Sequence, residues 1–167
     1  MILDVFIVSL LLSLIFKKRL YHLHETKIRL VYLFPLPFIL QFLQVGNRVL
    51  MMIASYSILF FLLVINWKIE GFKYIFFGSA LNFVAIMLGG GRMPVYGPLA
   101  AAMGLTPSIK HTLLEKFNAI LLIGDIIPAY TPWCRKFLIS IGDVFVYIGL
   151  VVFMLTKSKS SSFKRAF

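Results

Sequence analysis

Two aspartates in this chain occur in the same local sequence, and both lie beside apolar runs. Asp125 belongs to LIGDIIP (residues 122–128) and Asp143 to SIGDVFVYIGL (residues 140–150), so each follows Ile-Gly and precedes an apolar residue. An ionised group at bilayer depth is costly and normally faces protein or water. Two carboxylates at one membrane face could share a proton, bind a cation, or act as acid and base. Asp125 and Asp143 are therefore the candidate catalytic residues.

Each aspartate also has a structural interpretation. Asp143 could lock the last apolar segment in place through a hydrogen bond or an ion pair, with Arg92 as its partner. Asp125 could accept hydrogen bonds from nearby backbone N–H groups where Gly124 ends a helix. The residues alone leave both interpretations open beside the chemical one.

The run GGGRMPV (residues 89–95) is the second candidate site. The N–H groups of Gly89, Gly90 and Gly91 could turn toward an anion, and Arg92 would add a forked donor for phosphate or carboxylate. The alternative is that the glycines only end a helix and that Pro94 prevents its continuation. The run is not a nucleotide-binding P-loop, because no Gly-Lys-Ser/Thr follows it.

Further polar residues lie within the apolar segments. Gln44 and Arg48 are four residues apart and share a helical face with Gln41, whereas Asn82 shares a face with small residues and is typical of a contact between helices. We expect these groups to collect toward the outer leaflet with the two aspartates. The ligand-binding candidates are Gly89, Gly90, Gly91, Arg92, Asn82, Gln44 and Arg48.

The composition is that of a membrane protein. Of 167 residues, 60% are hydrophobic and 14% charged, and the mean hydropathy is +0.94. Soluble domains carry about 25% charged residues, so a water-soluble fold is not expected. The net charge of +11 fits basic loops on the inner side of a membrane, and no basic patch with interleaved aromatic residues indicates nucleic acid. We therefore expect membrane lipids as partners, an unidentified membrane protein as a further candidate, and no nucleic acid.

The apolar segments predict an all-α integral membrane bundle of five transmembrane helices in one domain, residues 1–156. Helices need about 20 residues to cross the hydrocarbon core. We expect an interfacial or re-entrant helix in the external connector, residues 89–136, beginning at Thr106 and ending near Gly124. Residues 157–167 form a basic cytoplasmic tail. The five segments are residues 2–16, 28–45, 49–67, 72–88 and 137–155.

Basic residues orient these segments with the N-terminus outside and the C-terminus in the cytoplasm. This arrangement puts most lysines and arginines on the inner side of the cell membrane, as the positive-inside rule requires. The first segment is followed by its basic residues instead of preceded by them, so we expect an uncleaved anchor and no signal peptide. The inner residues are Lys17, Lys18, Arg19, Lys27, Arg29, Lys68, Lys73, Lys157, Lys159, Lys164 and Arg165.

Cysteine and histidine give no sign of a metal site or other cofactor. Cys134 is the single cysteine, which excludes an intramolecular disulfide and a cysteine-based metal site. His22, His24 and His111 lack zinc-type spacing. We therefore expect no cofactor.

Three runs of this sequence resemble domain of unknown function family 5317 (DUF5317), an uncharacterised family of bacterial multi-pass membrane proteins. They are LNFVAIMLGGGRMPV (residues 81–95), LIGDIIP (residues 122–128) and SIGDVFVYIGL (residues 140–150). The resemblance implies the same segmentation and carries no assigned activity.

Three classes of function fit these observations. The first is binding or translocation of a small anion, lipid headgroup or lipid-linked molecule at the outer leaflet. The second is a non-catalytic membrane scaffold or accessory subunit, in which the polar residues only hold helices together. The third is a membrane-embedded enzyme that uses Asp125 and Asp143. The chain has no recognisable catalytic motif, so we favour binding or translocation.

Overall fold

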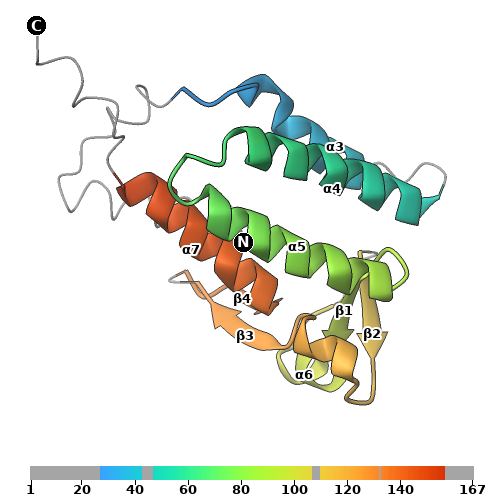
Figure 1. Ribbon diagram of the computed structural model, residues 1–167. Helices are drawn as coiled ribbons and strands as arrows, with labels where there is room; N and C mark the ends of the chain where they lie inside the picture. The colour runs from blue at the N-terminus through green and yellow to red at the C-terminus, as the bar shows by residue number, and fades with distance from the viewer. Residues whose placement is uncertain (1–26, 43–46, 107–109, 132, 157–167) are drawn as a thin grey trace, which may run out of the picture.

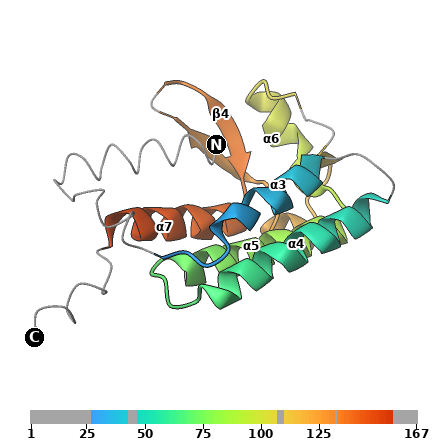
Figure 2. The ribbon, with the colours of Figure 1, turned by 90° about the horizontal axis from the view of Figure 1, so that it is seen from above.

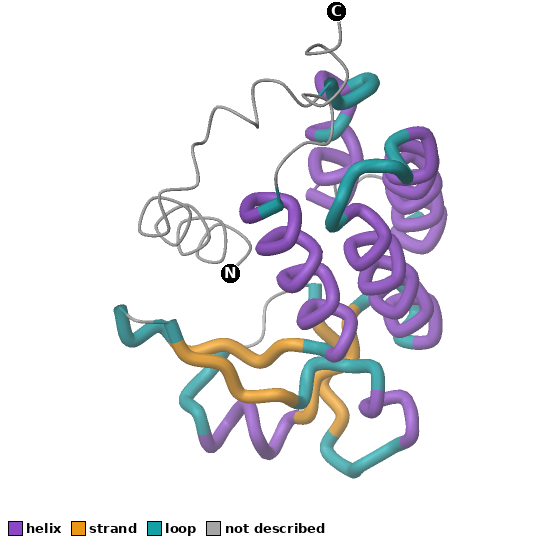
Figure 3. Tube along the Cα trace, turned by 60° about the vertical axis from the view of Figure 1, so that its left-hand side comes forward, coloured by secondary structure: helices purple, strands orange, loops and turns teal. Residues whose placement is uncertain are grey.

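The computed structural model describes residues 27–42, 47–106, 110–131 and 133–156. Apolar helices pack together, and two small sheets lie on one side of them (Figures 1 and 3). The elements in chain order are η1 (Val31–Leu33), α3 (Pro35–Phe42), α4 (Arg48–Ile65), α5 (Phe72–Leu88), β1 (Met93–Tyr96), α6 (Gly97–Ala102), β2 (His111–Leu114), η2 (Ala119–Leu122), β3 (Ile127–Tyr130), β4 (Lys136–Ile139) and α7 (Ile141–Leu155).

The expectation of a five-helix transmembrane bundle is wrong for this fold. Within the described ranges, α4 is the one helix that is long and apolar enough to cross a membrane, judged by its length and composition. Helix α5 has 17 residues, α7 has 15 and α3 only 8. The segment expected at residues 28–45 does not form one continuous helix, because Leu30 adopts a left-handed conformation (φ 55°) and α3 begins at Pro35. The segment expected at residues 2–16 lies outside the described residues.

The connector also differs from the expected interfacial helix. Between Thr106 and Gly124 the described residues form strand β2 and a single 3-10 turn, η2. Strand β2 pairs in parallel with β1, and β3 pairs in antiparallel with β4. A further bridge joins Val95 to Asp125. The β1–β2 pairing and the Val95–Asp125 bridge join residues 18 and 30 positions apart, so backbone bonds between distant segments replace those of the expected helix.

Helices α5 and α7 approach each other most closely where glycines meet. A Cβ atom built on Gly78 would collide with the carbonyl oxygen of Gly142, and one built on Gly149 would lie 2.6 Å from that of Gly71. Gly71 and Gly78 are seven residues apart, as are Gly142 and Gly149, so the two contacts repeat along two antiparallel helices. Small residues permit this spacing, because larger side chains would force the backbones apart.

Helix α4 packs against both α5 and α3, which lie beside it in Figure 2. Met52, Tyr56, Leu59 and Leu63 of α4 form a buried cluster with Phe72 of α5. The buried Asn66 at the end of α4 donates to the Arg29 carbonyl at 3.0 Å and accepts from the Arg29 N–H at 2.8 Å. These bonds hold the chain before α3 against the end of α4. The helices thereby enclose the space in which the polar side chains gather.

Candidate functional site

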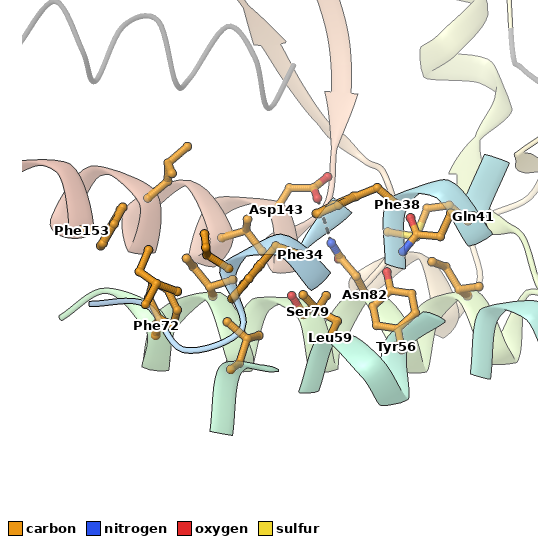
Figure 4. A pocket seen from close by; sticks show the side chains of 18 of the residues that line it. Phe34, Phe38, Gln41, Tyr56, Leu59, Phe72, Ser79, Asn82, Asp143 and Phe153 are labelled. Atoms are coloured by element: carbon orange, nitrogen blue, oxygen red, sulfur yellow. Dashed lines mark hydrogen bonds between the residues drawn. The ribbon is translucent and has the colours of Figure 1, made fainter. Parts of the chain in front are cut away.

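A cavity of about 450 Å³ lies among α3, α4, α5 and α7 and extends to Asp125 (Figure 4). Most of its wall is apolar. Phe72 and Phe153 mark one end, and Leu59 and Phe34 lie along its length. Polar side chains line the part nearer the sheets: Gln41, Ser79, Asn82, Asp125 and Asp143. Pockets of this size that combine an apolar wall with a few polar groups are typical sites for small molecules.

Asn82 and Asp143 meet in a hydrogen-bonded network between α5 and α7. Asn82 Nδ2 donates to Asp143 Oδ1 at 2.8 Å (Figure 4), and the Ser140 hydroxyl donates to Asn82 Oδ1 at 2.7 Å. Ser140 also caps α7, since its Oγ accepts from the Asp143 N–H at 2.9 Å while Asp143 Oδ2 accepts from the Ser140 N–H at 3.3 Å. One carboxylate therefore both caps α7 and joins it to α5.

The hydrogen-bond partner of Asp143 is Asn82 and not Arg92, which the sequence had suggested. A hydrogen bond to Asn82 holds α7, and Arg92 is exposed and does not line the cavity. Sequence reasoning missed Ser140, although the sequence carries a signal for it. Ser followed three residues later by an acid is a helix N-terminal capping box. Such a signal marks a cap and does not indicate which helix the acid will touch.

Asp125 is buried, with 6% of its surface exposed, at the bridge to β1. Its Oδ1 atom has no hydrogen-bond partner among the residues that the structure describes. Its Oδ2 lies 3.8 Å from Nε2 of His111. Burial, reinforced by the negative charge of Asp143, raises the pKa of Asp125 to about 8. Asp125 is therefore mainly protonated at pH 7.

The contact between His111 and Asp125 is not an ion pair at neutral pH. Burial lowers the pKa of His111 below its ordinary value, and the charges of Lys110 and Arg48 lower it further, while Asp143 opposes them. A neutral histidine and a protonated carboxyl 3.8 Å apart interact only weakly, because neither carries a charge and the distance exceeds that of a hydrogen bond. The buried Asp125 carboxyl is thus poorly satisfied by its described neighbours.

Asp125 also belongs to a second, smaller cavity of about 300 Å³ on the sheet side. Thr106, His111, Lys136 and Phe137 are among the residues that line it. Asp125 is the one described residue common to both cavities. Its carboxyl therefore lies between the polar end of the cavity within the helices and the smaller cavity beside the sheets.

The glycine run ends α5. The N–H groups of Gly89, Gly90 and Gly91 donate to the carbonyls of Ala85, Met87 and Ile86, at 2.9, 3.2 and 2.8 Å. Gly90 and Gly91 have φ values of 67° and 85°, which glycine adopts without steric cost. All three N–H groups are therefore engaged by the helix in this conformation. Their predicted role in anion binding stays a prediction.

The other candidates are placed differently. Arg48 Nε donates to the Gly91 carbonyl at 2.8 Å and so ties the start of α4 to the end of α5. Gln41 lines the larger cavity and donates to the buried Ser55 hydroxyl at 2.9 Å, and Ser55 in turn donates to the Pro37 carbonyl at 2.8 Å. Gln44 lies outside the described residues. The structure thus brings Asp125, Asp143, Asn82 and Gln41 to one cavity, without Arg48 or Arg92.

Fold and site together define a small protein with apolar helices around a cavity that is polar at one end, and with two small sheets beside them. The chain belongs to a family of unknown function (DUF5317), whose model matches residues 25–155, and this confirms the resemblance seen in the sequence. It is 36% identical over 159 residues to an uncharacterized protein of Thermotoga maritima, covering 95% of this chain and 93% of that one. No solved structure matches the chain.

Proposed function

We propose that this protein is embedded in the cell membrane and binds an amphipathic, lipid-like molecule in the larger cavity. The apolar body of the ligand would lie along Leu59, Phe72 and Phe153, and its polar end would reach Asp143 and Asp125. The observation that carries the proposal is the polarity of the cavity, which changes from apolar to polar along its length. An amphiphile matches both parts, whereas a small ion would leave the apolar part unused.

The outer faces of the helices support a membrane location. Large apolar side chains are exposed on all four main helices, among them Ile39 of α3, Phe61 of α4, Phe77 of α5 and Ile148 of α7, with 44–56% of their surface exposed. Extended apolar surface of this kind is uncommon in a soluble monomer and marks a surface that contacts lipid or protein. Helix α4, at 18 residues, has the length to cross the hydrocarbon core.

The charges of the residues that line the cavity favour a ligand whose head group is not an anion. Among the described residues that line it, two are aspartates and none is lysine, arginine or histidine. An anionic headgroup would therefore meet the negative charge of Asp143 without a compensating cation. Binding of an amphiphile that is not an anion agrees better with the site.

A cavity-filling variant tests the proposed function. Leu150 lines the cavity from α7, so in Leu150→Trp the larger side chain should occupy the space of the ligand's apolar body. Ile148→Trp is the matched control, because Ile148 lies on the same helix, is 44% exposed and does not line the cavity. Each protein would be purified in a mild detergent, and bound lipids would be extracted and identified by mass spectrometry.

We expect a molecule bound in near-stoichiometric amount to the unmodified protein and to Ile148→Trp, with at least a tenfold loss in Leu150→Trp. Equal amounts of the same lipids in all three proteins would contradict the proposal and favour a scaffold whose surface simply carries lipid.

We infer the orientation of the chain from its charges, because 11 of its 17 basic residues fall on one side of the proposed arrangement. Lys68 lies in the turn between α4 and α5 and Lys73 in the first turn of α5, at the end of these helices remote from the sheets (Figure 1). Basic residues near membrane segments favour the cytoplasmic side. We therefore place the sheets, with Asp125 and Cys134, on the outer side and the C-terminus in the cytoplasm.

Labelling of Cys134 checks this orientation. Its side chain is exposed between β3 and β4, so a membrane-impermeant maleimide added to intact cells should modify it. A Cys134→Ser variant controls for labelling of other proteins. Modification of Cys134 only after the cells are permeabilised would place the sheets in the cytoplasm.

A further inference from the structure

We propose that the polar end of the ligand is a cation, a quaternary ammonium or protonated amine, bound between Asp125 and Asp143. This inference rests on the proposed binding function and adds the chemical class of the ligand. Four features of the described residues lead to it.

The first feature is the local charge. Asp125 and Asp143 line the same cavity, and no basic residue of the described chain lines it with them. The protein as a whole carries a net charge of +11, which attracts anions to its surface in general. A preference for cations would therefore have to arise within this cavity, against the charge of the rest of the molecule.

The second feature is the unsatisfied acceptor. Oδ1 of Asp125 is buried and has no hydrogen-bond partner within the described ranges, and Oδ2 makes only the 3.8 Å contact with His111. Buried acceptors without partners are rare, because each loses its hydration and gains nothing in return. A positively charged group in the cavity would supply the missing attraction for this carboxyl.

The third feature is the aromatic surroundings of the polar end. Phe34, Phe38 and Tyr56 lie around Asn82 and Asp143 in the wall of the cavity (Figure 4). Aromatic faces attract cations through their quadrupoles, and clusters of such rings recognise quaternary ammonium groups. The same rings would offer an anion no comparable attraction.

The fourth feature is the position of Asp125 between the two cavities. A cation beside its carboxyl stabilises the ionised form, so binding would release the proton of Asp125. The smaller cavity, with His111, lies on the other side of this carboxyl. The other titratable groups that line the two cavities with Asp125 are Asp143 of α7, Tyr56 of α4, His111 of β2 and Lys136 of β4.

Three ligands with the same alkyl chain and different head groups show how much of the affinity depends on the charge of the head group. Decyltrimethylammonium, decanol and decyl sulfate would be titrated by calorimetry, below their aggregation limits, into the full-length protein held in an amphipathic polymer. We expect the cation to bind at least tenfold more tightly than decanol, and decanol more tightly than the sulfate. The permanent charge of the ammonium group keeps the ligand itself from titrating.

The pH dependence gives a second readout that needs no variant. Affinity for decyltrimethylammonium should rise from pH 6 to pH 8 and level off near pH 9, because Asp125 loses its proton over that range. Below pH 8 the measured heat should depend on the ionisation enthalpy of the buffer, which reports proton release. Asp125→Asn should abolish both effects and reduce the preference for the cation to the part that Asp143 supplies, while it retains decanol binding. Glu115→Gln removes an exposed acid outside the cavity and should change nothing.

The outcomes separate the two proposals. If decanol binds and the cation binds no more tightly, the cation inference is overturned and the binding function stands. If the sulfate binds as well as the cation, the inference is likewise overturned. If none of the three ligands binds, the proposed function itself fails, and the inference fails with it.

Discussion

Asn82→Leu should lower the free energy of unfolding by about 3 kcal/mol, because a hydrogen bond to a charged group contributes about 1.5–3 kcal/mol and a second bond is lost with it. Leucine has nearly the shape of asparagine but neither donates nor accepts. The Asp143 carboxylate would lose the Nδ2 donor, and the Ser140 hydroxyl would lose its acceptor, both between α5 and α7. For a chain of this size the loss corresponds to a fall in Tm of about 6–12 °C.

The measurement is thermal unfolding in detergent, followed by intrinsic fluorescence. Asn118→Leu is the control, because Asn118 is exposed and makes no side-chain cap for η2. In the double variant Asn82→Leu with Asp143→Leu, the unpaired carboxylate is also removed, so the cost should be smaller than the sum of the two single costs. Equal stability of Asn82→Leu and Asn118→Leu would show that the network contributes little.

Asp125→Asn should stabilise the protein, and the gain should grow with pH. The pKa of Asp125 is raised from an ordinary value of 3.8 to about 8 in the folded protein. Between these values the folded state keeps the proton and the unfolded state releases it, so the stability that Asp125 supplies is fully present below pH 3.8 and is lost as the pH rises to about 8. Asparagine does not ionise and avoids this loss, which amounts to at most about 1.4 kcal/mol per pH unit.

Unfolding experiments at pH 4, 6 and 8 on both proteins check the sign. The difference in the free energy of unfolding should be near zero at pH 4 and reach a few kcal/mol at pH 8. Glu115→Gln, which removes an exposed acid, should show no such trend. A difference that is constant with pH would mean that Asp125 is ionised in the folded state. Together with the expected weakening of the preference for the cation, a stabilising Asp125→Asn would identify a residue kept for function at the expense of stability.

The bounds and the packing face of single helices could be predicted from the sequence, because they depend on the spacing of apolar and small residues within one segment. The apolar run at residues 72–88 coincides with α5, and the face that Asn82 shares with Gly78 is the face that meets α7. A helical repeat of 3.6 residues determines such a face within a single segment. Which helix it would meet was not accessible, because the sequence of one helix does not specify its neighbour.

The connector and the site could not be derived in the same way. Strand β2 at His111–Leu114 exists because β1 lies beside it, and the Val95–Asp125 bridge joins residues 30 positions apart. The apolar residues before Gly124 do not form one buried helical face, because Leu113 and Phe117 are exposed whereas Leu121 is buried. The shared Ile-Gly-Asp sequence drew attention to Asp125 and Asp143, but their common cavity depends on how α7, β1 and α5 pack together.

The glycine contacts between α5 and α7 have a mechanical consequence for the cavity. Two backbones in direct contact at two points seven residues apart resist sliding and rotation, because any movement brings backbone atoms into collision. The opposite wall is built differently: α3 has 8 residues, follows a left-handed turn at Leu30 and is tied to α4 through Ser55 and Gln41. The cavity therefore has one stiff wall and one compliant wall, and a ligand longer or wider than the resting space would be accommodated by displacement of α3.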